Sequence, residues 1–178
     1  MAKFHNRLED GKKRTAFDLN EIFEYEDYAE VVLYKQNKEY VRVLIDVEDI
    51  EKVKDLKWHL DSRNYAKNGK LKTLMHRIIM SAKKGEYVDH INHNTLDNRK
   101  NNLRIVTNQQ NGMNRSLGLD NTSGCTGVSF NKNNSKWIVQ IGVNRRLVYL
   151  GHYDTLNEAI NVRKQAEVKY FGDYRKVD

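Results

Sequence analysis

Apolar, β-branched and aromatic residues dominate two stretches in the first third of the chain, residues 29–34 and 40–45. The polar stretch 35–38 between them is typical of a turn. Residues 46–53 are predicted to form a short helical segment, and further short strands are predicted at 57–60, 64–67 and 72–79. The pattern predicts a β-rich region that supports the central segment of the chain, which follows it.

In the middle of the chain, two short apolar strands flank a long polar loop. The first strand ends in Asp89 and His90, the loop ends in Asn102, and the second strand covers residues 103–106. A Thr-x-x-Gln capping box then opens a helix, because each of its side chains satisfies a backbone donor of the first turn. Asn111 falls in the first turns of that helix. The order of elements is therefore expected to bring an Asp, a His and two Asn side chains close together.

The last third of the chain predicts a separate unit of three strands and one helix. Residues 116–125 are small and polar, which indicates a linker. Strands are predicted at 126–131, 136–143 and 146–152, and a helix at 155–171 with a Thr-x-x-Glu capping box at its start. The helix residues spaced to lie on the sheet are Ala159, Ile160, Arg163, Ala166 and Tyr170.

The amino-acid composition limits which partners, cellular location and metal sites the protein can have. The 178 residues carry a formal charge of +7 spread along the chain, which favours a polyanionic partner. No apolar run is long enough to span a bilayer and the start lacks a signal-peptide core, so we expect a cytoplasmic protein without a membrane partner. A single cysteine, Cys125, excludes a paired-cysteine zinc site within the chain. Absence of proline with abundant Asn and Lys suits an AT-rich phage or bacterial genome.

The side chains gathered around Asp89 and His90 are those that hydrolysis of a phosphodiester needs. Carboxylate and amide oxygens are hard ligands that suit Mg²⁺ or Mn²⁺. A neutral imidazole beside them titrates near pH 7 and can take a proton from water.

This central segment resembles the His-Asn-His (HNH) nucleases with a ββα-metal core, in particular the homing type of phages and introns. The resemblance implies that Asp89 and Asn111 bind one divalent cation, Mg²⁺ or Mn²⁺, that His90 is the general base and that Asn102 orients it. Asn111 replaces the His of many members, so the chain resembles a His-Asn-Asn variant. The upstream pair His76 and Arg77 also matches the type, with a phosphate contact or core support as its role.

Each of these residues also has an ordinary structural interpretation. An Asp-His pair commonly ends a strand, and Asn residues in loops commonly form turns by bonding to the backbone. His93 and His152 are interpreted as surface or turn histidines. The complete spaced set, followed by a strand and a capped helix, favours the nuclease interpretation.

The C-terminal unit resembles the three-stranded DNA-binding domain of plant ethylene-response factors, which is also found at the C-terminus of phage homing nucleases. The resemblance rests on Lys136-Trp137, Tyr149-Leu150-Gly151 and the Glu158-Ala159 pair of the helix. It implies that one sheet face enters the major groove. Several plant positions carry Arg where this chain has Ser, Asn or Leu, so the plant target does not transfer. The implied reading face contains Thr126, Ser129, Asn131, Gln140, Leu147 and Tyr149, and the predicted phosphate contacts are Lys132, Lys136, Arg145 and Arg146, which position without specifying.

We therefore predict an α+β protein with a braced ββα-metal nuclease core and a C-terminal DNA-binding domain. The expected organisation is a basic, loosely ordered arm (1–20), a nuclease domain (21–115), a linker (116–125) and the C-terminal domain (126–178). The expected function is a metal-dependent endonuclease of double-stranded DNA, with His76, Arg77 and Arg104 as further DNA contacts. One ββα site acts on one strand, so a monomer should nick. A non-catalytic DNA-binding regulator with a relic nuclease core is the alternative, and no RNA-recognition signature supports an RNA-binding protein.

Overall fold

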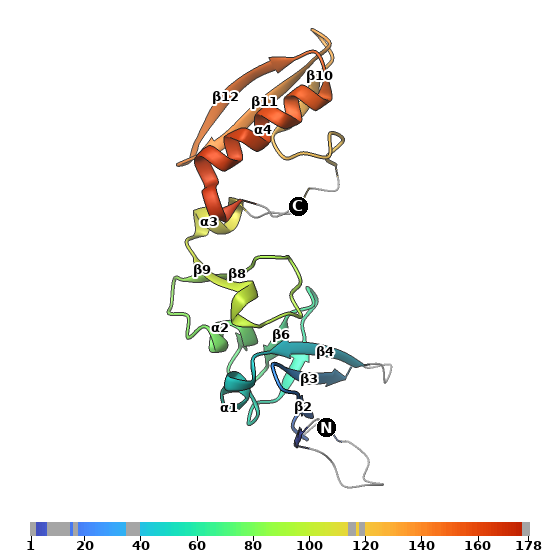
Figure 1. Cartoon of the computed structure of the whole chain (residues 1–178), viewed down its shortest axis with the longest axis vertical. Helices are drawn as coiled ribbons and strands as arrows, with labels where there is room; N and C mark the ends of the chain where they lie inside the picture. The colour runs from blue at the N-terminus through green and yellow to red at the C-terminus, as the bar shows by residue number, and fades with distance from the viewer. Residues whose placement is uncertain are drawn as a thin grey trace. The chain divides into compact units, whose positions relative to one another are not determined.

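The computed structural model describes residues 3–6, 15, 18–34, 40–113, 117 and 120–175. The chain divides into two compact units, Met1–Val106 and Thr107–Asp178, and each contains helices and an antiparallel sheet (Figure 1). The predicted α+β class is confirmed. None of the described helices is long and apolar enough to cross a membrane.

The first unit begins with a four-stranded antiparallel sheet in the order β1-β2-β3-β4. The predicted strands 29–34 and 40–45 are confirmed as β3 and β4, while the predicted turn 35–38 lies outside the described residues. The strands are β1 (Lys3–His5), β2 (Ile22–Glu24), β3 (Ala29–Tyr34) and β4 (Tyr40–Ile45).

The predicted basic arm is only partly described. Within it, Lys3–His5 pairs with β2, so this stretch is not the loose segment that the basic composition predicted. The ring of Phe4 packs on that of Phe23 at a centroid distance of 4.8 Å, which explains the pairing. Most of residues 7–17 lie outside the described part of the chain.

Besides a hairpin formed by β8 (Tyr87–His90) and β9 (Leu103–Val106), the first unit contains a second, three-stranded sheet and four short helical segments. The prediction of one strand at 72–79 is wrong, because its second half is the helix α2. Met75 and Ile79 are buried at a spacing of one helical turn, and a short apolar run of this kind suits either a strand or a helix. The segments are β5 (Trp58–Leu60), β6 (Ala66–Asn68), β7 (Thr73–Leu74), η1 (Val47–Asp49), α1 (Ile50–Val53), α2 (Met75–Ile79) and η2 (Lys100–Asn102).

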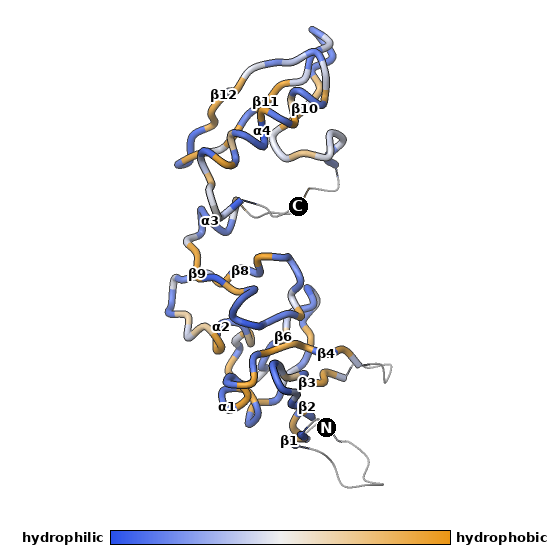
Figure 2. Tube along the Cα trace, in the orientation of Figure 1, coloured by the Kyte–Doolittle hydropathy of each residue, from blue (hydrophilic) through white to orange (hydrophobic). Residues whose placement is uncertain are grey.

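The core of the first unit joins the first sheet to the segments that follow it. Trp58 is 1% exposed and donates from Nε1 to the carbonyl of Val53 at 2.9 Å, so its polar atom is satisfied inside the core. Leu103 of the second motif strand belongs to the same cluster, which anchors the motif to the sheet. Figure 2 shows the contrast between the apolar stretch of β4 and the largely hydrophilic loop between β8 and β9. The buried residues are Ile22, Ala29, Val31, Leu33, Val43, Ile45, Ile50, Val53, Trp58, Ala66, Met75, Ile79 and Leu103.

The second unit has the predicted three strands and long helix. Its sheet order is β10-β11-β12, and α4 packs on the sheet face that carries Val139 and Ile141 (Figure 1). The capping box of Thr155 and Glu158 is present at the start of α4. Tyr170, predicted to lie on the sheet, is 37% exposed, and the next residue, Phe171, is buried instead. The elements are α3 (Asn108–Met113), β10 (Val128–Asn131), β11 (Lys136–Val143), β12 (Arg146–Tyr153), α4 (Leu156–Phe171) and η3 (Gly172–Tyr174).

The boundary between the units differs from the predicted one at 115. Helix α3 belongs to the second unit, because Met113 packs against Ile141 and Phe171 and Gln109 bonds the side chain of Asn144 at 2.9 Å. The end of the predicted linker also packs into this unit. Cys125 is 9% exposed within a core cluster, and its backbone carbonyl accepts a hydrogen bond from the hydroxyl of Ser123.

Candidate active site

The β8–β9 hairpin positions the predicted Asp-His pair. β8 (Tyr87–His90) runs antiparallel to β9 (Leu103–Val106), with Asp89 opposite Arg104 and His90 opposite Leu103. His90 is the last residue of β8, as the sequence predicted. Asp89 is 9% and His90 5% exposed, so both polar side chains are held within the fold.

Asp89 forms a salt bridge across the hairpin. Arg104 donates from Nε and Nη2 to Oδ2 of Asp89 at 3.0 and 2.8 Å. A cationic group therefore lies on the carboxylate that the resemblance assigns to metal. Arg104, predicted as a DNA contact, is engaged with Asp89 in this structure.

The imidazole of His90 is held by Asn98. His90 Nε2 lies 3.2 Å from Oδ1 of Asn98, whose Nδ2 donates to the carbonyl of Thr95 at 3.4 Å. An amide oxygen only accepts hydrogen bonds, so a hydrogen bond between these two atoms requires the proton of the neutral ring to be on Nε2. Burial lowers the pKa of His90 below its usual 6.5, which keeps the ring neutral at pH 7.

Two further rings pack around His90. The ring of His76, on α2, meets that of His90 edge-on at a centroid distance of 4.9 Å, and the ring of Tyr65 lies 5.8 Å from His90. His76 is 5% exposed, and burial lowers its pKa to about 3. A buried, neutral His76 suits core support, the second of its two predicted roles, and its contact with DNA stays a prediction.

Arg77, predicted as a DNA contact, closes the turn after α2. It donates from Nη1 to the carbonyl of Glu86 at 2.6 Å and from Nη2 to that of Lys83 at 2.9 Å. These bonds satisfy backbone acceptors that precede β8 and indicate a structural role.

Asn102 acts on the loop and not on the His90 ring. Its Oδ1 accepts from the backbone N–H of Asn92 at 3.0 Å, and its Nδ2 donates to the carbonyl of Asp97 at 2.8 Å. The side chain that contacts the His90 ring is that of Asn98, and the prediction that Asn102 orients His90 stays a prediction.

Sequence reasoning missed Asn98 because nothing local separates it from the other Asn residues of the loop. Asn98 is the loop residue that contacts His90 because the loop packs on β4. The N–H of Asn98 donates to the carbonyl of Leu44 at 2.8 Å, and the N–H of Leu44 donates to the carbonyl of Leu96 at 2.8 Å. Asn98 is consequently 1% exposed and fixed beside His90.

An ion pair within the loop adds to this rigidity. Arg99 donates from Nε and Nη2 to the two carboxylate oxygens of Asp97, each at 2.8 Å. This hydrogen-bonded guanidinium lowers the pKa of Asp97. The loop therefore keeps its conformation through a bidentate pair directly beside Asn98.

Asn111 lies on α3, in the second unit. The predicted capping box opens this helix, since Thr107 N–H donates to Oε1 of Gln110 at 2.9 Å and Gln110 N–H donates to Oγ1 of Thr107 at 3.2 Å. The role of Asn111 as a second metal ligand stays a prediction.

Of the two predicted metal ligands, the first unit contains Asp89. Its carboxylate is a hard oxygen ligand of the kind that suits Mg²⁺ or Mn²⁺, and in this structure it is paired with the guanidinium of Arg104. In the part of the chain that the structure describes, no three His, Cys, Asp or Glu side chains are grouped to hold a metal ion. Of the two predicted metal ligands, Asp89 and Asn111, only Asp89 is of those residue types.

The predicted reading residues of the second unit share one sheet face. The register pairs Gln140 with Tyr149 and Ser129 with Ile138, on the face opposite Val139 and Ile141. Tyr149 is 56% and Leu147 68% exposed, so this face is open. Of the other predicted contacts, Asn131 is half-buried on the same face, Thr126 lies exposed ahead of β10, and Lys132, Arg145 and Arg146 are exposed.

Two of the predicted DNA contacts on this surface, Lys136 and Tyr149, have polar partners within the unit. Lys136 Nζ pairs with Asp154 at 2.5 Å, which lessens its availability for phosphate, and Tyr149 OH lies 2.7 Å from Nδ1 of His152. The turn between β11 and β12 places Asn144 and Arg145 at positive φ, 51° and 62°, which holds the Arg145 side chain at a tightly turned tip.

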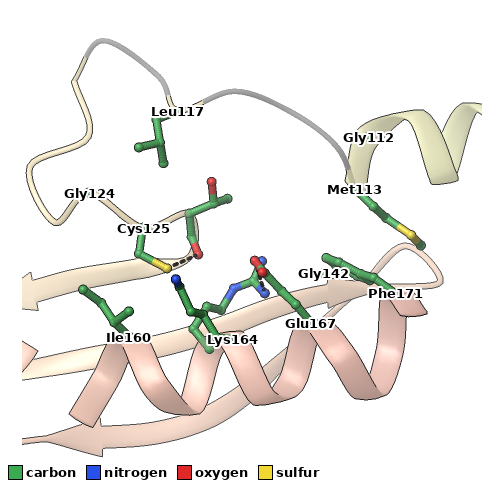
Figure 3. A pocket seen from close by; sticks show the side chains of 12 residues that line it. Gly112, Met113, Leu117, Gly124, Cys125, Gly142, Ile160, Lys164, Glu167 and Phe171 are labelled. Atoms are coloured by element: carbon green, nitrogen blue, oxygen red, sulfur yellow. Dashed lines mark hydrogen bonds and ion pairs between the residues drawn. The ribbon is translucent and has the colours of Figure 1, made fainter. Parts of the chain in front are cut away.

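The second unit also contains a cavity of about 380 Å³ beside α4 (Figure 3). Its wall includes Cys125, Ile160 and Phe171, and Arg163 pairs there with Glu167 at 2.8 Å. None of the predicted site residues except Thr126 lines it.

Parts of the chain are similar to known proteins. Residues 73–113 match the family model described as HNH endonuclease, a span that contains α2, the β8–β9 hairpin and α3. A protein of Acanthamoeba polyphaga mimivirus, named as an uncharacterized HNH endonuclease, is 29% identical over 133 residues, which are 71% of this chain and 70% of that protein. Protein 3.8 of Escherichia phage T7 is 39% identical over 54 residues, which are 30% of this chain and 45% of the phage protein. No solved structure matches the chain. The segment that carries Asp89, His90 and their loop is thus similar to the HNH endonuclease family model.

Proposed function

We propose that the protein is a divalent-metal-dependent endonuclease that hydrolyses phosphodiester bonds in double-stranded DNA. The observation that carries this proposal is the pairing, at the end of β8, of a carboxylate with a buried imidazole held by an amide oxygen. One such site acts on one strand, so a monomer is expected to nick. By resemblance to the homing type, the products carry 5′-phosphate and 3′-hydroxyl ends.

His90 is the general base in this proposal. Asn98 holds one nitrogen of its ring, and the neutral imidazole is the group that would take the proton from the attacking water. The lowered pKa of His90 favours the neutral form that can act as a base. Asn102 contributes by keeping the loop closed, so it is a positioning residue.

Asp89, with Asn111 as the ligand predicted from the resemblance, would hold one Mg²⁺ or Mn²⁺. When bound, the cation supplies positive charge against the scissile phosphate. Within the first unit, the hairpin register and the mostly buried setting of Asp89 fix where the carboxylate lies.

Incubation of the full chain with supercoiled plasmid tests the proposal. We expect conversion to the nicked circle with Mg²⁺ or Mn²⁺, none with a chelator in excess, and none by Asp89→Asn with metal. Undiminished cleavage in excess chelator would refute metal dependence. Binding of the plasmid without any metal-dependent cleavage would instead favour the regulator with a relic nuclease core.

The open face of β10–β12 is the proposed site of sequence recognition. Tyr149, Gln140 and Ser129 lie together on it, and Arg145 and Arg146 extend from its hairpin turn. A sheet face of this kind can enter the major groove, with base contacts specifying and phosphate contacts positioning.

A matched pair of tyrosines tests the recognition face. Sequencing the ends that the enzyme makes in a plasmid library defines its site preference. Tyr149→Ala should relax that preference, whereas Tyr170→Ala, an exposed tyrosine on α4, should not. Equal preference in both variants would show that this face does not read sequence.

A further inference from the structure

We propose that Arg104 is a built-in competitor for the metal at Asp89 and thereby couples metal binding to DNA binding. The inference rests on the proposed function and concerns how its metal site is filled. It assigns Arg104 a positioning role that neither the family match nor the resemblance supplies.

The first support is geometric. Arg104 and Asp89 are directly opposite in the hairpin, so their side chains emerge on the same face. Two N–H groups of the guanidinium, Nε and Nη2, converge on the single oxygen Oδ2 at 3.0 and 2.8 Å. A hydrogen-bonded charge pair of this geometry is stronger than a neutral hydrogen bond. A cation that coordinates Oδ2 would have to displace both bonds.

The second support is burial. The side chain of Arg104 is 15% and that of Asp89 10% exposed. Water screens this pair much less than it screens the exposed ion pairs of the same unit. The guanidinium is also always charged, so its competition does not disappear at neutral pH.

The charges of this pair predict that DNA binding and metal binding are coupled. Asp89 and Arg104 together carry no net charge, so a divalent cation that approaches them gains little from the carboxylate and is repelled by the guanidinium. A DNA phosphodiester supplies a negative charge and a pair of oxygens that match the guanidinium fork. Once DNA is present, Arg104 has an alternative acceptor and Oδ2 becomes available. The free protein should therefore bind metal weakly, and DNA should strengthen that binding.

Mn²⁺ binding to the full chain without DNA tests the competition directly. Free Mn²⁺ is measured by electron paramagnetic resonance during a titration of each variant. Arg104→Met removes the charge and should tighten Mn²⁺ binding at least tenfold. Arg104→Lys keeps the charge but loses the fork, and should tighten it only a few fold.

Arg42→Met is the matched control. Arg42 is paired with Glu30 on the first sheet of the same unit, so its loss removes an ion pair and one positive charge without touching Asp89. It should leave Mn²⁺ binding unchanged. If it tightens binding as much as Arg104→Met does, the effect comes from net charge and the inference is overturned.

Coupling is measured with a short mixed-sequence duplex in the His90→Gln background, which prevents turnover. The duplex should raise Mn²⁺ affinity more when Arg104 is present than in Arg104→Met. Thermal unfolding of the same samples checks the fold, and if Arg104→Met does not fold, the Lys variant carries the test. Mn²⁺ binding that is equal or weaker in the folded Arg104 variants overturns the inference. That result would leave chelator-sensitive cleavage intact, whereas metal-independent cleavage would instead refute the proposed function.

Discussion

Replacement of His90 by Gln separates the chemical role of the imidazole from its structural role. The Gln side chain can still donate an N–H to Oδ1 of Asn98, the bond that His90 makes at 3.2 Å, but it has no nitrogen able to accept a proton. We expect the variant to fold and bind DNA while cleavage nearly stops.

The expected rate loss follows from the role of a general base. A positioned base contributes about 10² to 10⁴ in rate, or roughly 2.7 to 5.4 kcal/mol at about 1.36 kcal/mol per factor of ten. His90→Ala should lose the same rate and also stability. It leaves the amide oxygen of Asn98, a residue 1% exposed, buried without its His90 contact, at a cost of about 1 to 3 kcal/mol. The rings of His76 and Tyr65 would also lose their packing partner.

Single-turnover nicking of supercoiled plasmid with Mg²⁺ or Mn²⁺ measures the rate, and anisotropy of a labelled duplex in chelator measures binding. Urea unfolding of both variants measures stability. Cleavage by His90→Gln at the rate of the parent would remove His90 from the mechanism. Equal stability of the Ala and Gln variants would refute the structural role of the bond to Asn98.

Three further outcomes can be measured on the full chain. Asn98→Ala should slow nicking by about fivefold, the kinetic equivalent of one hydrogen bond of roughly 1 kcal/mol, and an unchanged rate would show that the ring needs no such support. The folded-state pKa of His76, about 3, is below the usual 6.5, so the unfolded chain binds more protons between these values and stability falls as pH decreases from 6.5 towards 3. His76→Phe should flatten that decline in urea unfolding, and an equally steep decline would assign it to other groups. Loss of Arg145 and Arg146 together should lower the slope of log affinity against log salt by about 1.8, and an unchanged slope would exclude both as phosphate contacts.

The sequence alone determined those elements whose signals are local. Apolar residues at the period of strands mark β3, β4 and β10 to β12, and two capping boxes mark the starts of α3 and α4. These signals depend on residues within four positions of one another, so they do not depend on how the rest of the chain folds. The Asp-His pair at the end of β8 was predicted on the same basis. The helix α2 was not, because its short apolar run suits both periods.

Only the tertiary structure decided which side chains meet. The loop carries several Asn residues of equal local character, and Asn98 became the partner of His90 because the loop docks on Leu44 of β4, more than fifty residues earlier. The register of β8 and β9 placed Arg104 on Asp89, although sequence alone suggested a DNA contact. Packing of Met113 with Phe171 assigned α3 to the second unit. Hydrogen-bond and packing partners distant in sequence depend on the global arrangement of the backbone, which no local periodicity encodes.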